Sequence, residues 1–199
     1  MTFRIIVFFK APRPGEVKTR LAASIGPEGA CQAYLELSDT FLKQLVSFTQ
    51  VELRFSPDDA VLEIESFKKH PDWMLMPQGP GDLGQRMERS VQDALTEVDA
   101  VLCVGTDCPY IRKTDIDQAL EILRNQDAVV GPAADGGYWA IGLRRPESTL
   151  FQEMPWSTPE VLGITRQRLQ AANMTFRELR ELEDVDDLEA WKKYLVWAG

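Results

Sequence analysis

The sequence predicts one α/β domain, in which a mostly parallel β-sheet is covered by helices on both faces. Apolar runs typical of buried strands alternate with segments of helical periodicity. The chain has 199 residues, 44% of them hydrophobic, which is enough for one sizeable core. No linker, repeat or low-complexity segment interrupts the alternation, so we expect residues 1–199 to form a single domain.

The expected elements follow in chain order. The apolar run FRIIVFF (3–9) predicts a buried strand, which is followed by a proline- and glycine-rich loop and a helix over about 27–47. Three more strand and helix pairs are expected: 51–55 with 58–70, 73–77 with 83–95, and 100–105 with 114–123. This repetition favours a parallel sheet.

The rhythm changes after AVVGPA (128–133). The segment DGG leads directly into YWAIGL (138–143) and leaves no room for a helix, so we expect an antiparallel element near Tyr138–Leu143. A final helix is expected over about 188–197.

Charge is distributed unevenly along the chain. Asp and Glu number 31 against 22 Lys and Arg, a net charge of -9, yet Lys10 to Arg20 holds four basic residues and only Glu16 as an acid. A basic pocket on an acidic protein suits a small anion such as a nucleotide or sugar phosphate. It argues against nucleic acid, which needs an extended basic surface.

The cysteines and the N-terminus favour a cytoplasmic protein. The cysteines are odd in number and form no CxxC pair: Cys31, Cys103 and Cys108. The first apolar run is too short for a secretory signal, and no 18-residue apolar span suggests a membrane segment.

The first candidate site is the loop FKAPRPGEVKTRLA (9–22). Pro12 fixes the backbone and Gly15 permits close approach, so peptide N–H groups could face a phosphate that Lys18 and Arg20 neutralise. A solvated basic turn is the alternative. The loop matches neither a Walker motif nor GxGxxG.

The second is VGTDCPY (104–110), where Asp107 follows an apolar strand. A carboxylate at a strand tip can hold a divalent cation that bridges diphosphate oxygens, or it can simply cap a turn.

The third is GPAADGGYWAIGL (131–143). Gly136 and Gly137 leave room beside Asp135 for a sugar or acceptor, and Tyr138 and Trp139 offer aromatic surface. A tight hairpin is the alternative interpretation.

In GPGDLGQRM (79–87), Asp82 is expected to cap the following helix. Arg86 in its first turn opposes the helix dipole, which suggests an anionic ligand or a freely exposed side chain.

Six ordered segments carry a resemblance: FKAPRPGEVKTRLA, GDLGQRM, GTDCP, GPAADGGYWAIGL, WSTPEVL and DVDDLEAW. Together they resemble small bacterial nucleotide-diphospho-sugar transferases of the GT-A type, a group that includes radical-SAM/selenodomain-associated transferases. The resemblance implies a three-layer α/β/α Rossmann-like sandwich that binds a nucleotide sugar, usually with Mg²⁺ or Mn²⁺.

The resemblance also implies roles. The nucleotide- and phosphate-binding candidates are Lys10, Ala11, Pro12, Gly15, Lys18, Arg20, Asp82 and Arg86. The others are Asp107 as metal ligand, Asp135 as catalytic residue, and Gly136, Gly137, Tyr138 and Trp139 as the donor and acceptor pocket.

One departure from the resemblance stands out. Such enzymes commonly carry Asp-x-Asp, but position 105 is Gly105, so a second acid must come from Asp135 or from the cluster Asp184, Asp186 and Asp187. Within that cluster, Asp186 or Asp187 could instead cap the last helix.

Three functions remain open. The first is metal-assisted glycosyl transfer from a nucleoside-diphosphate sugar to an unknown acceptor. The second is nucleotidyl transfer with release of pyrophosphate, as in molybdenum-cofactor and phospholactate nucleotidyltransferases. The third is nucleotide binding without catalysis.

Overall fold

A computed structural model of the chain describes residues 1–199. Its strands are β1 (Phe3–Lys10), β2 (Val51–Ser56), β3 (Met74–Pro77), β4 (Ala100–Gly105), β5 (Ala128–Pro132), β6 (Tyr138–Leu143) and β7 (Phe176–Glu178). Its helices are α1 (Thr19–Gln44), α2 (Val61–Glu65), α3 (Leu83–Leu95), α4 (Lys113–Ile122), the short 3-10 helix η1 (Ser148–Leu150), α5 (Val161–Ala171) and α6 (Leu188–Ala198).

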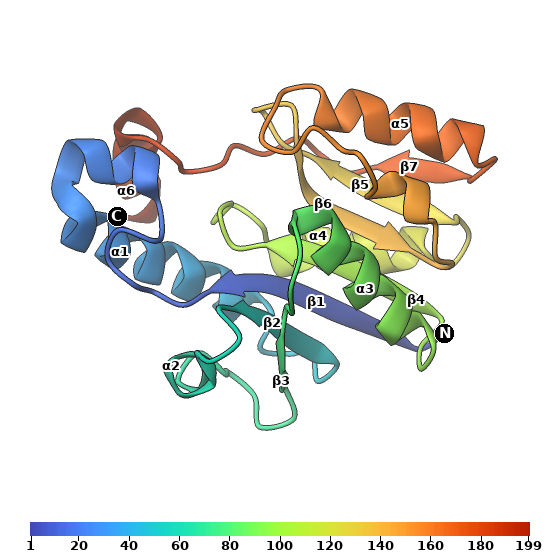
Figure 1. Cartoon of the computed structure of the whole chain (residues 1–199), viewed down its shortest axis with the longest axis horizontal. Helices are drawn as coiled ribbons and strands as arrows, with labels where there is room; N and C mark the ends of the chain where they lie inside the picture. The colour runs from blue at the N-terminus through green and yellow to red at the C-terminus, as the bar shows by residue number, and fades with distance from the viewer.

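All seven strands form one sheet in the order β3-β2-β1-β4-β6-β5-β7 (Figure 1). β1 lies near the centre and pairs in parallel with β2 and β4. β6 is antiparallel to both β4 and β5, which confirms the expected change of direction at Tyr138–Leu143. The mostly parallel sheet of the predicted fold class is therefore confirmed.

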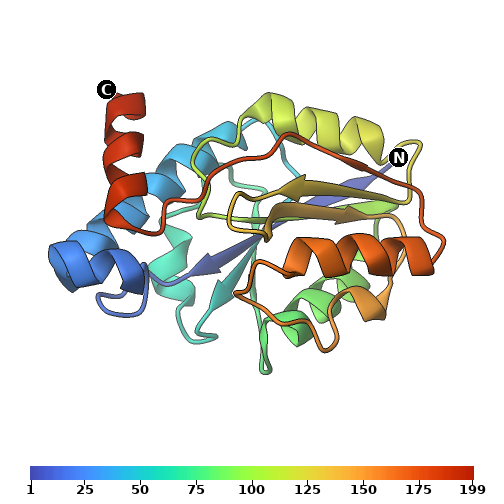
Figure 2. The same cartoon turned by 90° about the horizontal axis from the view of Figure 1, so that it is seen from above.

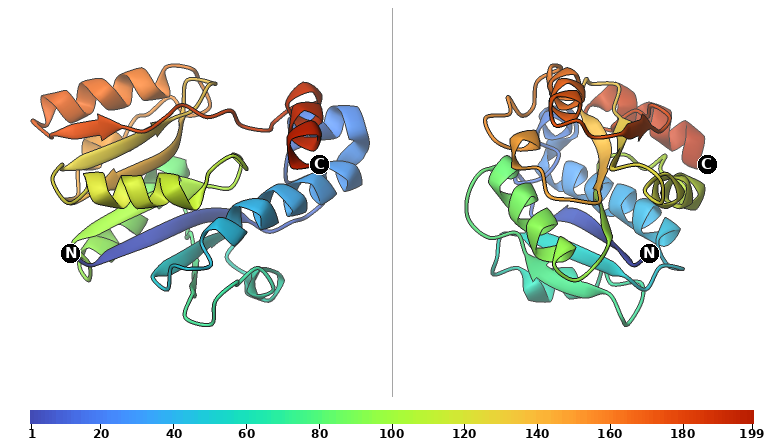
Figure 3. Two further views of the ribbon diagram at one scale, coloured as in Figure 1. Left: turned by 180° about the vertical axis from the view of Figure 1, so that it is seen from behind. Right: turned by 90° about the vertical axis from the view of Figure 1, so that its right-hand side faces the viewer.

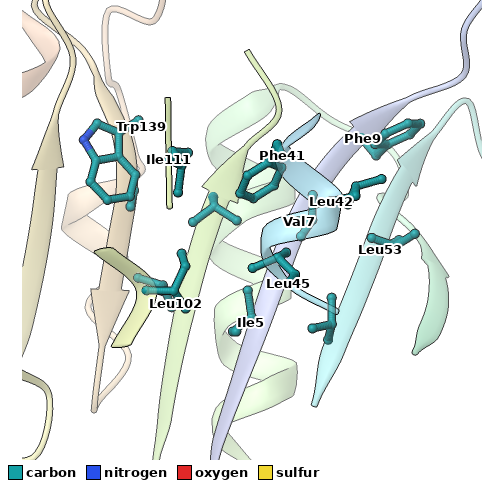
Figure 4. Packing of buried hydrophobic residues seen from close by; sticks show 14 of the residues in the cluster. Ile5, Val7, Phe9, Phe41, Leu42, Leu45, Leu53, Leu102, Ile111 and Trp139 are labelled. Atoms are coloured by element: carbon teal, nitrogen blue, oxygen red, sulfur yellow. The ribbon is translucent and has the colours of Figure 1, made fainter. Parts of the chain in front are cut away.

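Helices cover both faces of the sheet: Figure 2 shows α1 and α4 on one side and α3 and α5 on the other. Side chains of a strand alternate between faces, so Ile5, Val7 and Phe9 join the larger core cluster while Ile6 joins the smaller one. In Figure 4, these three residues of β1 lie on the same side of the sheet as Phe41 and Leu42 of α1. The burial of both faces explains why residues 5–9 of β1 are all apolar.

Some elements differ from their predicted bounds. α1 already starts at Thr19, and the expected start near residue 27 is a kink inside it, where Gly26 (φ 79°) is followed by Pro27. α2 has only five residues of the helix expected over 58–70. The sequence did not predict η1, α5 or β7, the last being a three-residue edge strand with too few residues for a readable alternation.

The segment after β7 crosses from the edge of the sheet to α1, against which α6 packs (Figure 3). Backbone hydrogen bonds join it to the ends of other strands: Leu182 N–H donates to Pro132 O, and Val185 N–H donates to Asp107 O. Residues 179–187, here called the crossing segment, thereby reach the carboxyl ends of the central strands. None of the helices combines the length and hydrophobicity needed to span a bilayer.

Candidate functional site

A cavity of about 660 Å³ lies at the carboxyl ends of the central strands. Ligands of open α/β sheets bind at this edge, and the volume is in the range of small-molecule sites. The cavity brings together these predicted residues: Lys10, Lys18, Arg20, Asp82, Arg86, Asp107, Asp135, Gly137, Tyr138 and Trp139. It does not include Ala11, Pro12, Gly15 or Gly136.

Ala11 and Pro12 have structural roles instead of lining the cavity. Ala11 N–H donates to Ser56 O, and Pro12 O accepts a hydrogen bond from the Cys31 thiol at 3.1 Å. Gly15 has a φ of 84°, a conformation that side chains disfavour, so it shapes the turn. These residues hold the loop in place and do not line the cavity.

Lys18 occupies a central position between two acids. Its ammonium lies 2.6 Å from an Asp107 carboxylate oxygen and 2.9 Å from one of Asp186, and its side chain is 2% exposed. Burial alone would lower the pKa of Lys18, but the two carboxylates outweigh that effect and raise it. Lys18 is therefore held in its charged form between acids.

Two cations of the loop are freer to meet an anion. Lys10 lines the cavity and forms no ion pair with the protein, while the Arg20 side chain is 70% exposed, with Asp186 3.8 Å away. Beside them, the backbone N–H groups of residues 17–20 donate to no protein acceptor. These groups lie just before and at the start of α1, where unpaired N–H groups favour anions.

Asp82 and Arg86 lie at the start of α3 and have different contacts there. Asp82 is the N-cap in a capping box with Gln85, as predicted. Arg86 Nε donates to Gly81 O at 2.8 Å, and an Nη1 group lies 3.3 Å from Gln78 Oε1, while its Nη2 has no protein partner. Arg86 thus fixes the loop before α3 and still presents an N–H group at the cavity, whereas Asp82 serves the helix.

The crossing segment supplies acids near Asp107. Asp184 lines the cavity, and its carboxyl makes no hydrogen bond with the protein. Burial, followed by the neighbouring charges of Asp107, Asp135 and Asp186, raises the pKa of Asp184 to about 7. Asp187 has a different role, because its side chain caps α6 by accepting from Ala190 N–H at 2.9 Å.

These carboxylates fit a hard divalent cation in their chemistry. Oxygen ligands are those that Mg²⁺ and Mn²⁺ prefer, and a partly buried acid without a hydrogen-bond partner gains from a nearby positive charge. No three His, Cys, Asp or Glu side chains converge into a preformed metal site, and Lys18 supplies the positive charge between Asp107 and Asp186.

The turn after β5 has features of both a tight hairpin and a ligand site, the two interpretations of DGG. Asp135 Oδ1 accepts from Gly137 N–H at 2.8 Å, as in a tight turn, yet the side chain is exposed in the cavity. Gly136 has a φ of 88°, and a Cβ there would lie 2.4 Å from Pro159 O. Gly136 is therefore required by backbone packing, which corrects the expectation that it makes room for a ligand.

Trp139 also departs from its predicted role. Its side chain is only 3% exposed, and its indole N–H donates to Arg180 O at 3.1 Å. It points to the opposite face from Tyr138, because neighbours on a strand alternate. Trp139 belongs to the core beneath the cavity, so it lines the cavity floor but exposes little of the aromatic surface expected from it.

Several cavity residues were missed by sequence reasoning. They are Tyr34, Gln78, Trp156, Ser157 and Thr158. Tyr34 fixes the end of β1, since its hydroxyl accepts from Lys10 N–H and donates to Lys10 O. Burial raises the pKa of Tyr34 to about 12, so it stays neutral. Trp156, Ser157 and Thr158 lie in WSTPEVL, one of the segments that carry the resemblance, but nothing in that segment indicated a place at the cavity.

The mostly parallel sheet is covered by helices and has one cavity at the carboxyl ends of its strands, lined by cations, a helix start and several carboxylates. This is the Rossmann-like architecture of nucleotide-diphospho-sugar transferases. The chain belongs to the family described as "Uncharacterized protein conserved in bacteria (DUF2064)", whose model matches residues 42–158. No curated protein matches the sequence.

Solved structures of similar fold support this placement. A "putative nucleotide-diphospho-sugar transferase" from Desulfovibrio desulfuricans G20 is 33% identical, with 94% of this chain and 84% of that chain covered and a TM-score of 0.84. It confirms the family resemblance found in the sequence motifs.

Two more distant structures share the fold alone. CMP:2-keto-3-deoxy-manno-octonic acid synthetase, complexed with CTP, is 12% identical, covers 100% of this chain and 98% of its own, and has a TM-score of 0.64. Rv0371c from Mycobacterium tuberculosis H37Rv, complexed with manganese, is also 12% identical, with 98% and 99% covered and a TM-score of 0.53.

Proposed function

We propose that this protein is a transferase that uses a nucleoside-diphosphate sugar as glycosyl donor. The observation that carries the proposal is the joint placement of an anion-binding region and a group of carboxylates in one cavity. The anion-binding region consists of Lys10, Arg20 and the free N–H groups of residues 17–20. The family membership and the 33% identical relative support the same class of enzyme.

The diphosphate would lie at the start of α1. There the backbone N–H groups donate to phosphate oxygens, and Lys10 and Arg20 neutralise their charge. Such donors are already in position before the reaction, so they stabilise the charge that develops on the departing diphosphate.

Asp107 and Asp184 are the residues that would hold a divalent cation. When bound, Mg²⁺ or Mn²⁺ would supply positive charge that offsets the charge of the leaving diphosphate. The unpartnered Asp184 carboxyl supports this assignment. The manganese complex of the similarly folded Rv0371c supports the kind of cation and not the choice of residues. Asp184 thus provides the second acid that Gly105 leaves missing from the Asp-x-Asp pattern.

Asp135 would orient or deprotonate the acceptor hydroxyl. Its side chain is exposed in the cavity, and one carboxylate oxygen is fixed by Gly137 N–H, which leaves the other oxygen free for a ligand. A positioned carboxylate of this kind can act as general base.

Nucleotidyl transfer is the second candidate. It is favoured by Arg86, a further cation of the cavity whose Nη2 is free, because Lys10, Arg20 and Arg86 together would suit a triphosphate. That reaction breaks the bond between the α- and β-phosphates and releases pyrophosphate.

A thermal-shift screen followed by product detection distinguishes these functions. The protein is heated with nucleoside mono-, di- and triphosphates and with nucleotide sugars, each with and without MnCl₂. Stabilisation by diphosphates and nucleotide sugars supports glycosyl transfer, and triphosphate binding with pyrophosphate release supports the alternative. If a ligand binds but no product forms, and if Asp107→Asn binds that ligand as well as the wild type does, the protein is a nucleotide-binding protein without catalysis.

A further inference from the structure

One wall of the cavity has no role in the function proposed above. It is formed by Tyr138 of β6 and Trp156, whose rings meet edge to face with centroids 6.2 Å apart and an interplanar angle of 79°. Met87 of α3 supports it, since its sulfur lies 3.9 Å from the Tyr138 hydroxyl. This geometry is favourable for aromatic pairs and leaves both side chains ordered at the cavity.

Close backbone packing holds Trp156 in place. A Cβ on Gly84 would lie 2.2 Å from Phe151 O and 3.0 Å from the Trp156 indole nitrogen, so only glycine allows α3 to approach this loop. The loop that carries Trp156 also packs against the turn at Gly136, where Pro159 leaves no space for a Cβ. The Gly136 carbonyl accepts a hydrogen bond from Leu162 N–H at 2.9 Å. The aromatic wall is therefore preorganised by two glycines.

Ser157 adds a polar group beside Trp156. Its φ of 64° is in the left-handed region, which non-glycine residues adopt at a cost and which is found preferentially at ligand sites. The Ser157 side chain is exposed in the cavity, and its hydroxyl makes no hydrogen bond with the protein. By contrast, the neighbouring Thr158 hydroxyl is already used, because it donates to Pro155 O at 2.8 Å.

The order of the strands places the carboxylate of Asp107 between the proposed phosphate site at the start of α1 and the wall formed by Tyr138 and Trp156. The basic loop follows β1, Asp107 follows β4 and Tyr138 begins β6, and these strands are consecutive neighbours in the sheet. A group attached to a diphosphate at the start of α1 would thus pass the carboxylates and reach Tyr138 and Trp156.

We propose that Tyr138, Trp156 and Ser157 form a subsite for the sugar ring of the ligand. Trp156 packs against the C–H face of the ring, and the Ser157 hydroxyl bonds a ring hydroxyl. A nucleobase would also stack on an indole, but it requires several donors and acceptors in its own plane, whereas Ser157 carries the one hydroxyl of this wall that has no protein partner. The inference rests on the proposed function for the position of the phosphates, and it holds for a glycosyl donor and for a sugar-phosphate acceptor.

The test measures how much a sugar adds to the affinity of a nucleotide. Isothermal titration calorimetry compares UDP with UDP-glucose, GDP with GDP-mannose, and ADP with ADP-glucose. In the wild-type protein at least one conjugate should bind about five- to tenfold more tightly than its own diphosphate, as expected for ring packing plus a hydrogen bond.

Three variants dissect the wall. Trp156→Ala should reduce this gain to less than about twofold and leave the affinity for the diphosphate unchanged, whereas Trp156→Phe should keep most of it. Ser157→Ala should lose part of the gain. Trp197→Ala is the control, because Trp197 is an exposed tryptophan of α6 outside this cavity. Circular dichroism verifies that each variant is folded.

Saturation-transfer NMR with methyl α-glucoside, methyl α-mannoside and methyl β-galactoside repeats the comparison without a nucleotide. Binding of a glycoside that Trp156→Ala abolishes supports the subsite even if no nucleotide binds, in which case the proposed function alone fails. An unchanged gain in Trp156→Ala, or the absence of any sugar contribution in both experiments, overturns the subsite.

Discussion

The ammonium of Lys18 lies 2.6 Å from the carboxylate of Asp107 and joins the first loop of the chain to the loop after β4. The same group lies 2.9 Å from Asp186, which is 168 residues away along the chain. The buried lysine thus occupies the position between acids in which a bound cation would also be favourable, and it links the start of α1 to the crossing segment.

Lys18→Met should destabilise the protein and make it more responsive to metal. The variant leaves the half-exposed carboxylates of Asp107 and Asp186 facing one another without their counter-charge, so the cost should lie below the roughly 3–5 kcal/mol of breaking a fully buried pair. We expect a clearly lower Tm, together with a larger rise in Tm on addition of MnCl₂ than in the wild type. Lys43→Met, which removes an exposed partner of Asp39, should change Tm little. A wild-type Tm in Lys18→Met would show that this contact contributes nothing to stability.

Arg20→Ala should weaken nucleotide binding without unfolding the protein. A charge-assisted hydrogen bond to a phosphate is worth about 1.5–3 kcal/mol, so Kd should rise roughly tenfold or more while Tm stays constant. Calorimetry with the nucleotide identified in the ligand screen measures the change. Arg124→Ala, an exposed arginine paired with Glu121, is the matched control. Equal affinities in the wild type and Arg20→Ala would remove Arg20 from the site.

Asp135→Asn and Gly136→Val should separate chemistry from structure at the same turn. Asn can still accept from Gly137 N–H but carries no charge, so turnover should fall strongly while Tm barely moves. Valine at position 136 should destabilise the fold, because it meets Pro159 and a φ of 88°. Steady-state kinetics and thermal unfolding report the two effects. Full turnover in Asp135→Asn would exclude Asp135 as the base.

Asp115→Asn should reduce stability at neutral pH and have a smaller effect in acid. Arg180 forms a bidentate pair with Asp115, with both N–O distances at 2.7 Å. Burial opposes ionisation of Asp115, but hydrogen bonds from Arg180 and from Arg112 N–H outweigh it and lower its pKa.

The lowered pKa of Asp115 determines how the free energy of unfolding depends on pH. A carboxyl whose folded-state pKa is below its unfolded value of about 3.9 stabilises the protein above that pH, and the stabilisation is lost as pH falls through the folded-state pKa. Urea unfolding at pH 7 and pH 3 should therefore show a difference between Asp115→Asn and wild type that shrinks in acid. Asp117→Asn, which breaks an exposed pair with Lys113, should be nearly neutral at both. A difference that grows in acid would contradict this linkage.

Local patterns predicted the elements whose formation depends on neighbouring residues. The segment 3–9, with its apolar run over residues 5–9, forms β1. The capping residue Asp82 begins α3 at the expected position, and the short DGG connection leads into the antiparallel β6. The kinked start of α1 and the three-residue β7 were not predictable in the same way. Gly26 and Pro27 usually interrupt a helix, and β7 gains its strand conformation from pairing with β5.

Strand and helix periodicity and turn residues act over short distances, so the α/β class, most of the strands and helices, and the loops that supply Lys10, Asp107 and Asp135 could be predicted from the sequence. The contacts of Lys18 with Asp107 and Asp186, the burial of Trp139 and the place of Trp156 at the cavity became visible only in the folded chain. These relations depend on strand order, on the path of the crossing segment and on close backbone approach at glycines, which bring together residues far apart along the chain.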